Sequence, residues 1–223
     1  MKKLVALGVV LLVAGPAMAG TWAEIPDAPA GPISGQVTDG TGQLDLITGS
    51  TSPGDSTDAF WIHITNVDNF YATTDPTYDG RLPSQWDTRL WLFKPDGTPV
   101  MGNDDSPNFS PGYMSLLTNP ADWPGELGAD PPAPLTVGEY LLVFGGYGTD
   151  PGDGSGTSLI DLATDFEALH GPNPSAGSFV SWMGNPETGE YQIGLGGVEF
   201  SVPEPGTLSL LCLGALALIR RHR

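Results

Sequence analysis

The sequence predicts an all-β protein, a jelly-roll-like β-sandwich of about eight strands with one short helix. Gly and Pro are abundant, at 31 and 22 residues, and they fall in short clusters along the whole chain. Long stretches with the 3.6-residue apolar period of a helix are nearly absent. Between the clusters lie short segments in which apolar and polar residues alternate, as is typical of strands that bury one face.

Eight segments have this strand character. They are residues 43–48, 59–66, 88–94, 98–102, 113–117, 138–147, 178–183 and 190–201. In the second of them, Phe60, Ile62 and Ile64 share one face, and we expect that face to line the core. Pro95-Asp96-Gly97 supplies a turn between the third and the fourth segments, which predicts a hairpin.

One segment has helical spacing instead. Ser158 can act as its N-cap, and Gly171 can stop it. The apolar residues at three- to four-residue intervals between them are Leu159, Leu162, Phe166 and Leu169. We therefore expect one short helix lying across the sandwich.

The N-terminus has the layout of a secretory signal peptide. A basic start, Met1-Lys2-Lys3, is followed by an apolar run from Leu4 to Val13. Ala17 and Ala19 form a small-x-small cleavage site in front of Gly20. We expect residues 1–19 to be a signal peptide, 20–35 an extended leader that is not packed, and 36–202 the sandwich domain.

The C-terminus, residues 203–223, has three parts. Pro203, Glu204 and Pro205 form a rigid spacer, an apolar run of thirteen residues follows from Thr207 to Ile219, and Arg220, Arg221 and Arg223 close the chain. As a helix the run would be about 20 Å long, whereas a bilayer core is about 30 Å thick. Such a tail engages a membrane but spans it poorly.

This three-part layout resembles the PEP-CTERM sorting signal of Gram-negative bacteria. The resemblance implies handling by the export machinery and an exosortase-like membrane protease. It also implies passage through the inner membrane to the cell surface or extracellular matrix. Whether the tail is cleaved or retained as an anchor stays open.

The exported body is strongly acidic. Without the two terminal segments it keeps three basic residues and 25 acidic ones, a formal charge of 3 − 25 = −22. Nucleic acid and anionic membrane surfaces are therefore excluded as partners of the body. The single cysteine, Cys212, lies in the tail, so the body has no disulfide.

A second resemblance covers residues 35–147. Four motifs carry it, in this order: Asp58-Ala-Phe-Trp-Ile-His-Ile-Thr65, Asp87-Thr-Arg-Leu-Trp-Leu-Phe-Lys-Pro-Asp-Gly97, Asn103-Asp-Asp105 and Val137-Gly-Glu-Tyr-Leu-Leu-Val143. Together they resemble the bacterial pre-peptidase C-terminal domain, a jelly-roll sandwich found beside secreted peptidases and on surface proteins. The chain departs from that family in acidic, Pro-rich insertions at 68–86 and 119–134, and no peptidase domain accompanies the match.

The body shows no pattern typical of a catalytic site. It has two histidines: His63 lies on a predicted strand, and His170 lies where it could cap the end of the predicted helix. There is no Gly-x-Ser-x-Gly elbow, HExxH helix or phosphate loop. We therefore predict no catalytic residues and no enzyme activity.

A calcium site is the cofactor that the residues suggest. The predicted hairpin brings Asp87 back towards Asn103, Asp104 and Asp105. Carboxylate and amide oxygens gathered at one sheet edge suit a cation with six to eight oxygen ligands. The Asp150–Gly156 loop is a rival site.

Tryptophans offer a glycan-binding alternative. Trp86 and Trp123 lie in the polar insertions, where exposed rings could stack on sugars. Trp61 and Trp91 lie on strands, and we expect them to pack on the second face of their sheet.

Together these features predict a non-catalytic, exported surface or extracellular-matrix protein with a structural or adhesive role. Extracellular polysaccharide or matrix proteins are its expected partners. A carbohydrate-binding module is the alternative, and a secreted hydrolase is the third reading.

Overall fold

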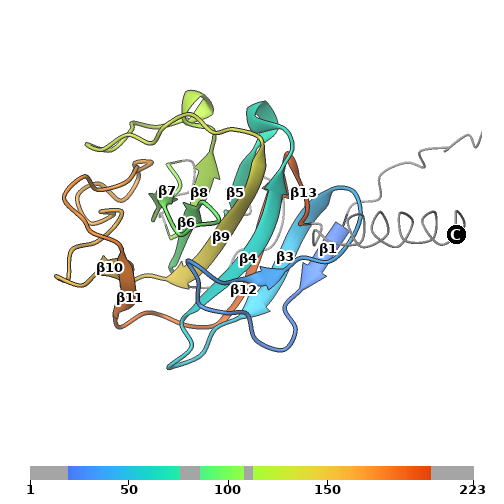
Figure 1. The fold of residues 1–223 in the computed structure, drawn as a ribbon, viewed down its shortest axis with the longest axis horizontal. Helices are drawn as coiled ribbons and strands as arrows, with labels where there is room; N and C mark the ends of the chain where they lie inside the picture. Colours follow the sequence, from blue (N-terminus) through green and yellow to red (C-terminus); the bar gives the residue numbers. More distant parts are fainter. Residues whose placement is uncertain (1–19, 76–85, 108–112, 202–223) are drawn as a thin grey trace, which may run out of the picture.

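The computed structural model describes residues 20–75, 86–107 and 113–201, and two β-sheets form most of this part (Figure 1). The first sheet has the strand order β1 (Gly20–Ala23), β3 (Leu44–Ser50), β12 (Glu190–Gly196), β5 (Tyr71–Thr73), β8 (Leu116–Thr118). The second has the order β13 (Val198–Phe200), β4 (Thr57–Ile64), β9 (Gly138–Gly146), β6 (Thr88–Phe93), β7 (Pro99–Asn103), and β2 (Gln36–Val37) also pairs with β4. The prediction of an all-β sandwich is confirmed.

Three smaller elements complete the described chain. A separate two-stranded ribbon consists of β10 (Thr149–Asp153) and β11 (Phe179–Gly184). The short 3₁₀ turns are η1 (Val67–Asn69) and η2 (Pro120–Asp122). No helix of the described residues is long and apolar enough to cross a membrane.

The main core lies between the two sheets. Leu44, Ile47 and Ile193 come from the first sheet, and Ile62 and Leu142 come from the second, all fully buried. Burying a side chain of this size is worth about 1.5–3 kcal/mol. This core is therefore the main source of stability for a body without a disulfide.

The strand β4 has the predicted phase. Phe60, Ile62 and Ile64 are fully buried in the main core, while Trp61 and His63 point to the other face and are half-buried. Each of the eight predicted strand segments overlaps a strand of the structure. The turn between β6 and β7 also forms as predicted, with Gly97 at a φ of 84°, a backbone conformation that favours glycine.

The second sheet is covered on both faces. Trp91, Phe93, Leu141 and Val143 point away from the main core into a second apolar cluster. The β10–β11 ribbon and the loop between its two strands cover that cluster, and the ring centroids of Trp182 and Trp91 are 5.2 Å apart. This confirms the expectation that Trp61 and Trp91 pack on the sheet's second face.

The predicted helix at 158–171 is absent. The backbone N–H groups of Leu159 and His170 donate to Pro151 and Gly102, on neighbouring segments. Ser158 donates its hydroxyl to the Ile160 carbonyl instead of capping a helix, and Phe166 is 41% exposed. The apolar spacing that suggested a helix arises from a loop that buries its leucines at irregular points.

The leader is packed, contrary to expectation. Its first residues form β1, which pairs in parallel with β3. The Trp22 ring nitrogen donates to the Gln36 side chain at 2.8 Å, and Ala28 is 3% exposed. The residues before Gly35 therefore belong to the sandwich.

Candidate functional site

The β6–β7 hairpin brings three carboxylates together. Leu90 pairs with Asn103 across the hairpin, so residues before β6 and after β7 meet at one end of it. One carboxylate oxygen from each of Asp87, Asp104 and Asp105 lies within 4.8 Å of the other two. The predicted approach of Asp87 to this end of the hairpin is thereby confirmed.

Each of the three carboxylates has one buried oxygen without a hydrogen-bond partner. The Oδ1 atoms of Asp87, Asp104 and Asp105 are shielded from solvent and have no hydrogen-bond partner. Asp104 as a whole is only 1% exposed. Leaving a buried carboxylate oxygen without a partner costs more free energy than leaving a neutral buried group unpaired. The cluster is therefore short of hydrogen-bond donors or of positive charge.

Arg89 offsets part of the negative charge of the cluster. Its guanidinium, 4% exposed, donates to Asp104 Oδ2 at 2.7 Å and to Asp150 Oδ1 at 3.0 Å. It also donates to the Thr149 carbonyl at 2.9 Å, and the Tyr147 ring lies 4.9 Å away. These contacts leave the three Oδ1 atoms unpaired.

The electrostatics of the cluster follow from burial and crowding. Burial, together with the charges of Asp104 and Asp105, raises the pKa of Asp87 to about 8. Burial and the charge of Asp104 raise the pKa of Asp105 to about 6. Burial also raises the pKa of Asp104, although Arg89 opposes that effect.

Asn103, predicted as a fourth ligand, has another role. Its amide nitrogen donates to the carbonyls of Asp105 and Ala168, at 2.9 and 3.0 Å. Its amide oxygen accepts from the Leu116 N–H at 2.9 Å. Because backbone groups occupy both ends of the amide, Asn103 holds the hairpin end in place and is not a candidate ligand.

In the rival segment Asp150–Gly156, the carboxylate of Asp153 already has hydrogen-bond partners. Asp153 Oδ1 accepts from the N–H groups of Ser155 and Thr157, and Oδ2 accepts from that of Gly177. These hydrogen bonds lower the pKa of Asp153. Its carboxylate is already paired, so the loop is the weaker candidate for a cation.

A second carboxylate cluster escaped the sequence analysis. One oxygen from each of Glu24, Asp27 and Asp58 lies within 4.8 Å of the other two. Asp58 is fully buried; its Oδ2 accepts from the Tyr191 hydroxyl at 2.7 Å, and its Oδ1 has no partner. Burial raises the pKa of Asp58 to about 8, with the charges of Glu24, Asp55 and Asp27 adding to the effect.

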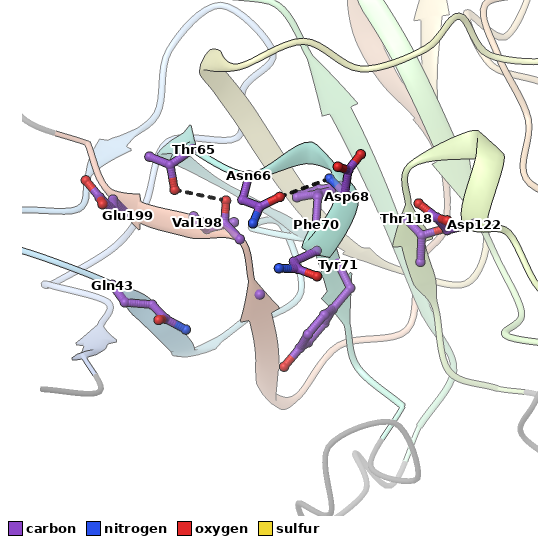
Figure 2. Close-up of a pocket in the computed structure, with 13 residues that line it drawn as sticks. Gln43, Thr65, Asn66, Asp68, Phe70, Tyr71, Thr118, Asp122, Val198 and Glu199 are labelled. Atoms are coloured by element: carbon purple, nitrogen blue, oxygen red, sulfur yellow. Dashed lines mark hydrogen bonds between the residues drawn. The ribbon is translucent and has the colours of Figure 1, made fainter. Parts of the chain in front are cut away.

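A polar groove of about 620 Å³ lies where β13, η1 and η2 approach one another. Figure 2 shows the side chains of Gln43, Asn66, Tyr71, Asp122 and Glu199 around it. Asn66 accepts from the Asp68 N–H at 3.2 Å, which shapes one wall. Amides and carboxylates can hydrogen-bond the hydroxyls of sugars, and an aromatic ring such as that of Tyr71 can pack against a sugar face.

The two tryptophans predicted to stack on glycans are packed. Trp123 is 8% exposed, and its ring nitrogen donates to the Glu126 carbonyl at 3.0 Å. Trp86 packs its edge against Phe144, with 5.5 Å between the ring centroids, and donates to the Glu190 carbonyl at 2.9 Å. The expectation of an exposed ring is wrong for Trp123, which is buried, and Trp86 is half-buried, because both side chains pack against the body.

The two histidines have structural partners. His63 Nδ1 lies 2.6 Å from Glu139 Oε1, and the Ser201 hydroxyl donates to Glu139 Oε2 at 2.8 Å. His170 is 3% exposed, and its Nε2 lies 2.7 Å from the Asp165 carbonyl. His170 caps no helix, since the predicted helix is absent.

Comparison with known families identifies the C-terminal segment. Residues 201–223 match the model of the PEP-CTERM protein-sorting motif. No curated protein and no solved structure matches the chain. The motif marks the chain as an exported protein that exosortase-like membrane machinery processes, with transient anchoring in the membrane.

The predicted targeting residues lie almost wholly outside the described part of the chain. These residues are Ala17, Ala19, Pro203, Glu204, Pro205, Arg220, Arg221 and Arg223. Gly20, the residue after the predicted cleavage point, is the first residue of β1.

Proposed function

We propose that the chain is a non-catalytic protein of the cell surface or extracellular matrix of a Gram-negative bacterium, with a structural or adhesive role. The sorting motif at residues 201–223 carries the proposal. The motif gives the export pathway a C-terminal spacer to cleave, and residues 1–19 give it a signal peptide to remove. Extracellular polysaccharide and matrix proteins are the proposed partners of the released body.

The position of the motif supports processing without damage to the body. Ser201 is held by its N–H, which donates to Thr38 Oγ1 at 3.0 Å, and by its hydroxyl bond to Glu139. The sandwich thus ends two residues before Pro203. Cleavage near Pro203–Gly206 would leave both sheets complete.

The arrangement around His63 supports a non-catalytic role. In a serine hydrolase the histidine lies between the nucleophile and the acid, so that it can take the proton of the hydroxyl. Here Glu139 lies between His63 and Ser201, and the Ser201 hydroxyl donates to the carboxylate. A carboxylate in that position does not activate the serine in the manner of the triad.

The order of motifs that resembles the pre-peptidase C-terminal domain supports a binding or spacer role rather than a reaction. An accessory sandwich of that kind displays its surface and leaves catalysis to a partner domain. The body's formal charge of −22 favours neutral glycans and cations over anionic partners.

Intact-mass measurement of the protein from the native cell surface tests the sorting proposal. The expected mass begins at Gly20 and ends between Pro203 and Gly206. A variant with Pro203→Ala, Glu204→Ala and Pro205→Ala should keep the tail and stay with the membrane. A wild-type surface protein that still contains residues 207–223 would contradict processing by cleavage.

The polar groove favours a second candidate function, that of a carbohydrate-binding module. Its lining combines the Tyr71 ring with the side chains of Asn66, Asn69 and Asp122. A panel of neutral polysaccharides tests it, with Asn69→Ala and Tyr71→Ala as groove variants and Trp123→Phe as a control outside the groove. Specific binding lost in both groove variants supports the module. Turnover of a polysaccharide, ester or peptide would instead favour a hydrolase.

A further inference from the structure

We propose that Asp87, Asp104 and Asp105 form a calcium-binding site at the end of the β6–β7 hairpin. The proposal goes beyond export and surface sorting, and it rests on how these three carboxylates are buried and left unpaired. A carboxylate cluster on the surface would need no ion, because water would solvate it.

The unpaired oxygens supply the first argument. The Oδ1 atoms of Asp87, Asp104 and Asp105 are shielded from solvent and have no hydrogen-bond partner, and each of these carboxylates has an oxygen within 4.8 Å of the other two. Asp104 is 1% exposed, so water does not solvate this side chain from outside. Buried charges are normally paired with an opposite charge or coordinate a metal.

The spacing supplies the second argument. Calcium binds oxygen ligands at about 2.3–2.6 Å, so two oxygens on opposite sides of one ion are about 4.6–5.2 Å apart. The three carboxylates each offer an oxygen within 4.8 Å of the others. This spacing is close to that of oxygens which share one calcium ion.

Arg89 does not already fill this role. Its Nη1 and Nη2 atoms are directed at Asp104 Oδ2, Asp150 Oδ1 and the Thr149 carbonyl. The cluster of three carboxylates keeps a formal charge of −2 after Arg89 is counted. That charge, on oxygen ligands alone, suits a hard cation.

The donor set favours calcium over other metals. Zinc and copper sites usually contain histidine or cysteine, and this cluster contains neither. Magnesium demands octahedral geometry and gives up its water reluctantly. Calcium accepts irregular oxygen sites, and water or the second carboxylate oxygens can complete its shell.

The ion would connect three parts of the body. The Asp87 carbonyl accepts from the Tyr147 N–H at 3.1 Å, beyond the end of β9. The Asp105 N–H donates to the Phe166 carbonyl at 2.9 Å, in the loop after the β10 strand. Calcium would thus hold β6, β7 and that loop together in a body that has no disulfide.

Calcium titration of the full-length chain, purified in a mild detergent and freed of metal with chelator, tests the proposal. We expect calorimetry to show calcium binding. At about 10 mM calcium, mass action on a site with a dissociation constant of about 0.1 mM raises Tm by roughly 5–10 °C. Magnesium at the same ionic strength should give a clearly smaller rise.

The decisive variant is Asp87→Asn with Asp105→Asn, which leaves Asp104 paired with Arg89. Without metal, its Tm should be higher than that of the wild type, because two of the three crowded carboxyl groups are gone. With calcium, its Tm should not rise. The matched control, Asp39→Asn with Glu126→Gln, removes two exposed charges and should respond to calcium as the wild type does.

Three outcomes would overturn the proposal. One is an equal rise in Tm with calcium and with magnesium in the wild type, which would mean charge screening. Another is an unchanged calcium response in the Asp87→Asn, Asp105→Asn variant, which would place the ion elsewhere, for example at Glu24, Asp27 and Asp58. The last is loss of the calcium response in the control variant as well as in the Asp87→Asn, Asp105→Asn variant. None of these bears on C-terminal processing, which intact mass reads separately.

Discussion

Replacing Asp58 with asparagine should stabilise the protein, and the gain should grow with pH. Asp58 is fully buried, its Oδ1 has no hydrogen-bond partner, and one of its carboxylate oxygens lies within 4.8 Å of oxygens of Glu24 and Asp27. Asparagine has the same shape. Its oxygen can still accept from the Tyr191 hydroxyl, and its amide nitrogen can donate to the neighbouring carboxylates.

The sign follows from proton linkage. Burial raises the pKa of Asp58 from an ordinary value of 3.8 to about 8 in the folded protein. Below about pH 4 Asp58 is protonated in both the folded and the unfolded chain, so no charge is buried and stability is not reduced. As the pH rises towards 8, the unfolded chain has lost a proton that the folded chain still holds, so stability falls. Above about pH 8 the full cost is present.

The magnitude follows from the same shift. One pKa unit corresponds to about 1.4 kcal/mol, so a shift from 3.8 to about 8 sets an upper limit of roughly 6 kcal/mol. We expect about 2–4 kcal/mol, because the effective dielectric constant even at buried sites is about 20. This is a large fraction of the stability of a typical domain.

Urea unfolding of the full-length chain with chelator present, at pH values from about 4.5 to 9, measures the effect. The free-energy difference between Asp58→Asn and the wild type should be small at the acid end and complete by about pH 9. Asp39→Asn, which removes an exposed charge, should shift the curve little. Parallel pH profiles for Asp58→Asn and the wild type would refute the reasoning, as would a variant that is less stable at pH 9.

Two further substitutions test the core and the buried ion pair. Ile62→Ala should lower the free energy of unfolding by about 2–5 kcal/mol and Tm by roughly 5–20 °C, because Ile62 is fully buried. Ile25→Ala, at a residue 65% exposed, should change stability by less than about 0.5 kcal/mol, and equal losses would show that the strand phase is wrong. Arg89→Met leaves Asp104 buried without its partner and should cost about 3–5 kcal/mol without calcium. Denaturant curves should show a smaller loss with calcium, since the ion would replace the missing charge, and an equal loss would contradict that coupling.

The sequence predicts the central strands because their signals are local. In β4 the alternation that places Phe60, Ile62 and Ile64 inside is visible in eight residues, and the structure keeps it. The meeting of Asp87 with Asp104 and Asp105 needs only a hairpin with a clear turn at Gly97. Register then follows from the turn.

Elements that depend on distant partners could not be predicted in this way. The strand β10 contains Asp150-Pro-Gly-Asp153, a sequence typical of turns, and it is a strand because β11 pairs with it. Tertiary pairing overrides local preference in such cases. The helix predicted at 158–171 does not form for a similar reason, because N–H groups of this loop donate to carbonyls of other segments.

The second carboxylate cluster could not be predicted from the sequence for the same reason, because its residues come from distant segments. Glu24 follows β1 in the first sheet and Asp58 lies on β4 in the second, so only the packing of the two sheets brings these residues, 34 positions apart, together. A leader taken to be unpacked could not contribute a residue to the body. One local signal was present: Asp58 stands directly before the apolar run Ala59-Phe-Trp-Ile, where a charged side chain is costly to bury.

The register of the second sheet separates the carboxylates from the groove. Thr57 pairs with Gly145 and Thr88 pairs with Gly146, so Asp58 and Asp87 lie at the same end of the sheet, on either side of β9. Two strand spacings separate them, about 10 Å. The groove lies at the other end of β4, beside Ile64 and its partner Val198. Loss of the calcium response in Asp87→Asn, Asp105→Asn should therefore leave any glycan binding at the groove unchanged, because the two sites share no residue and lie at opposite ends of the second sheet.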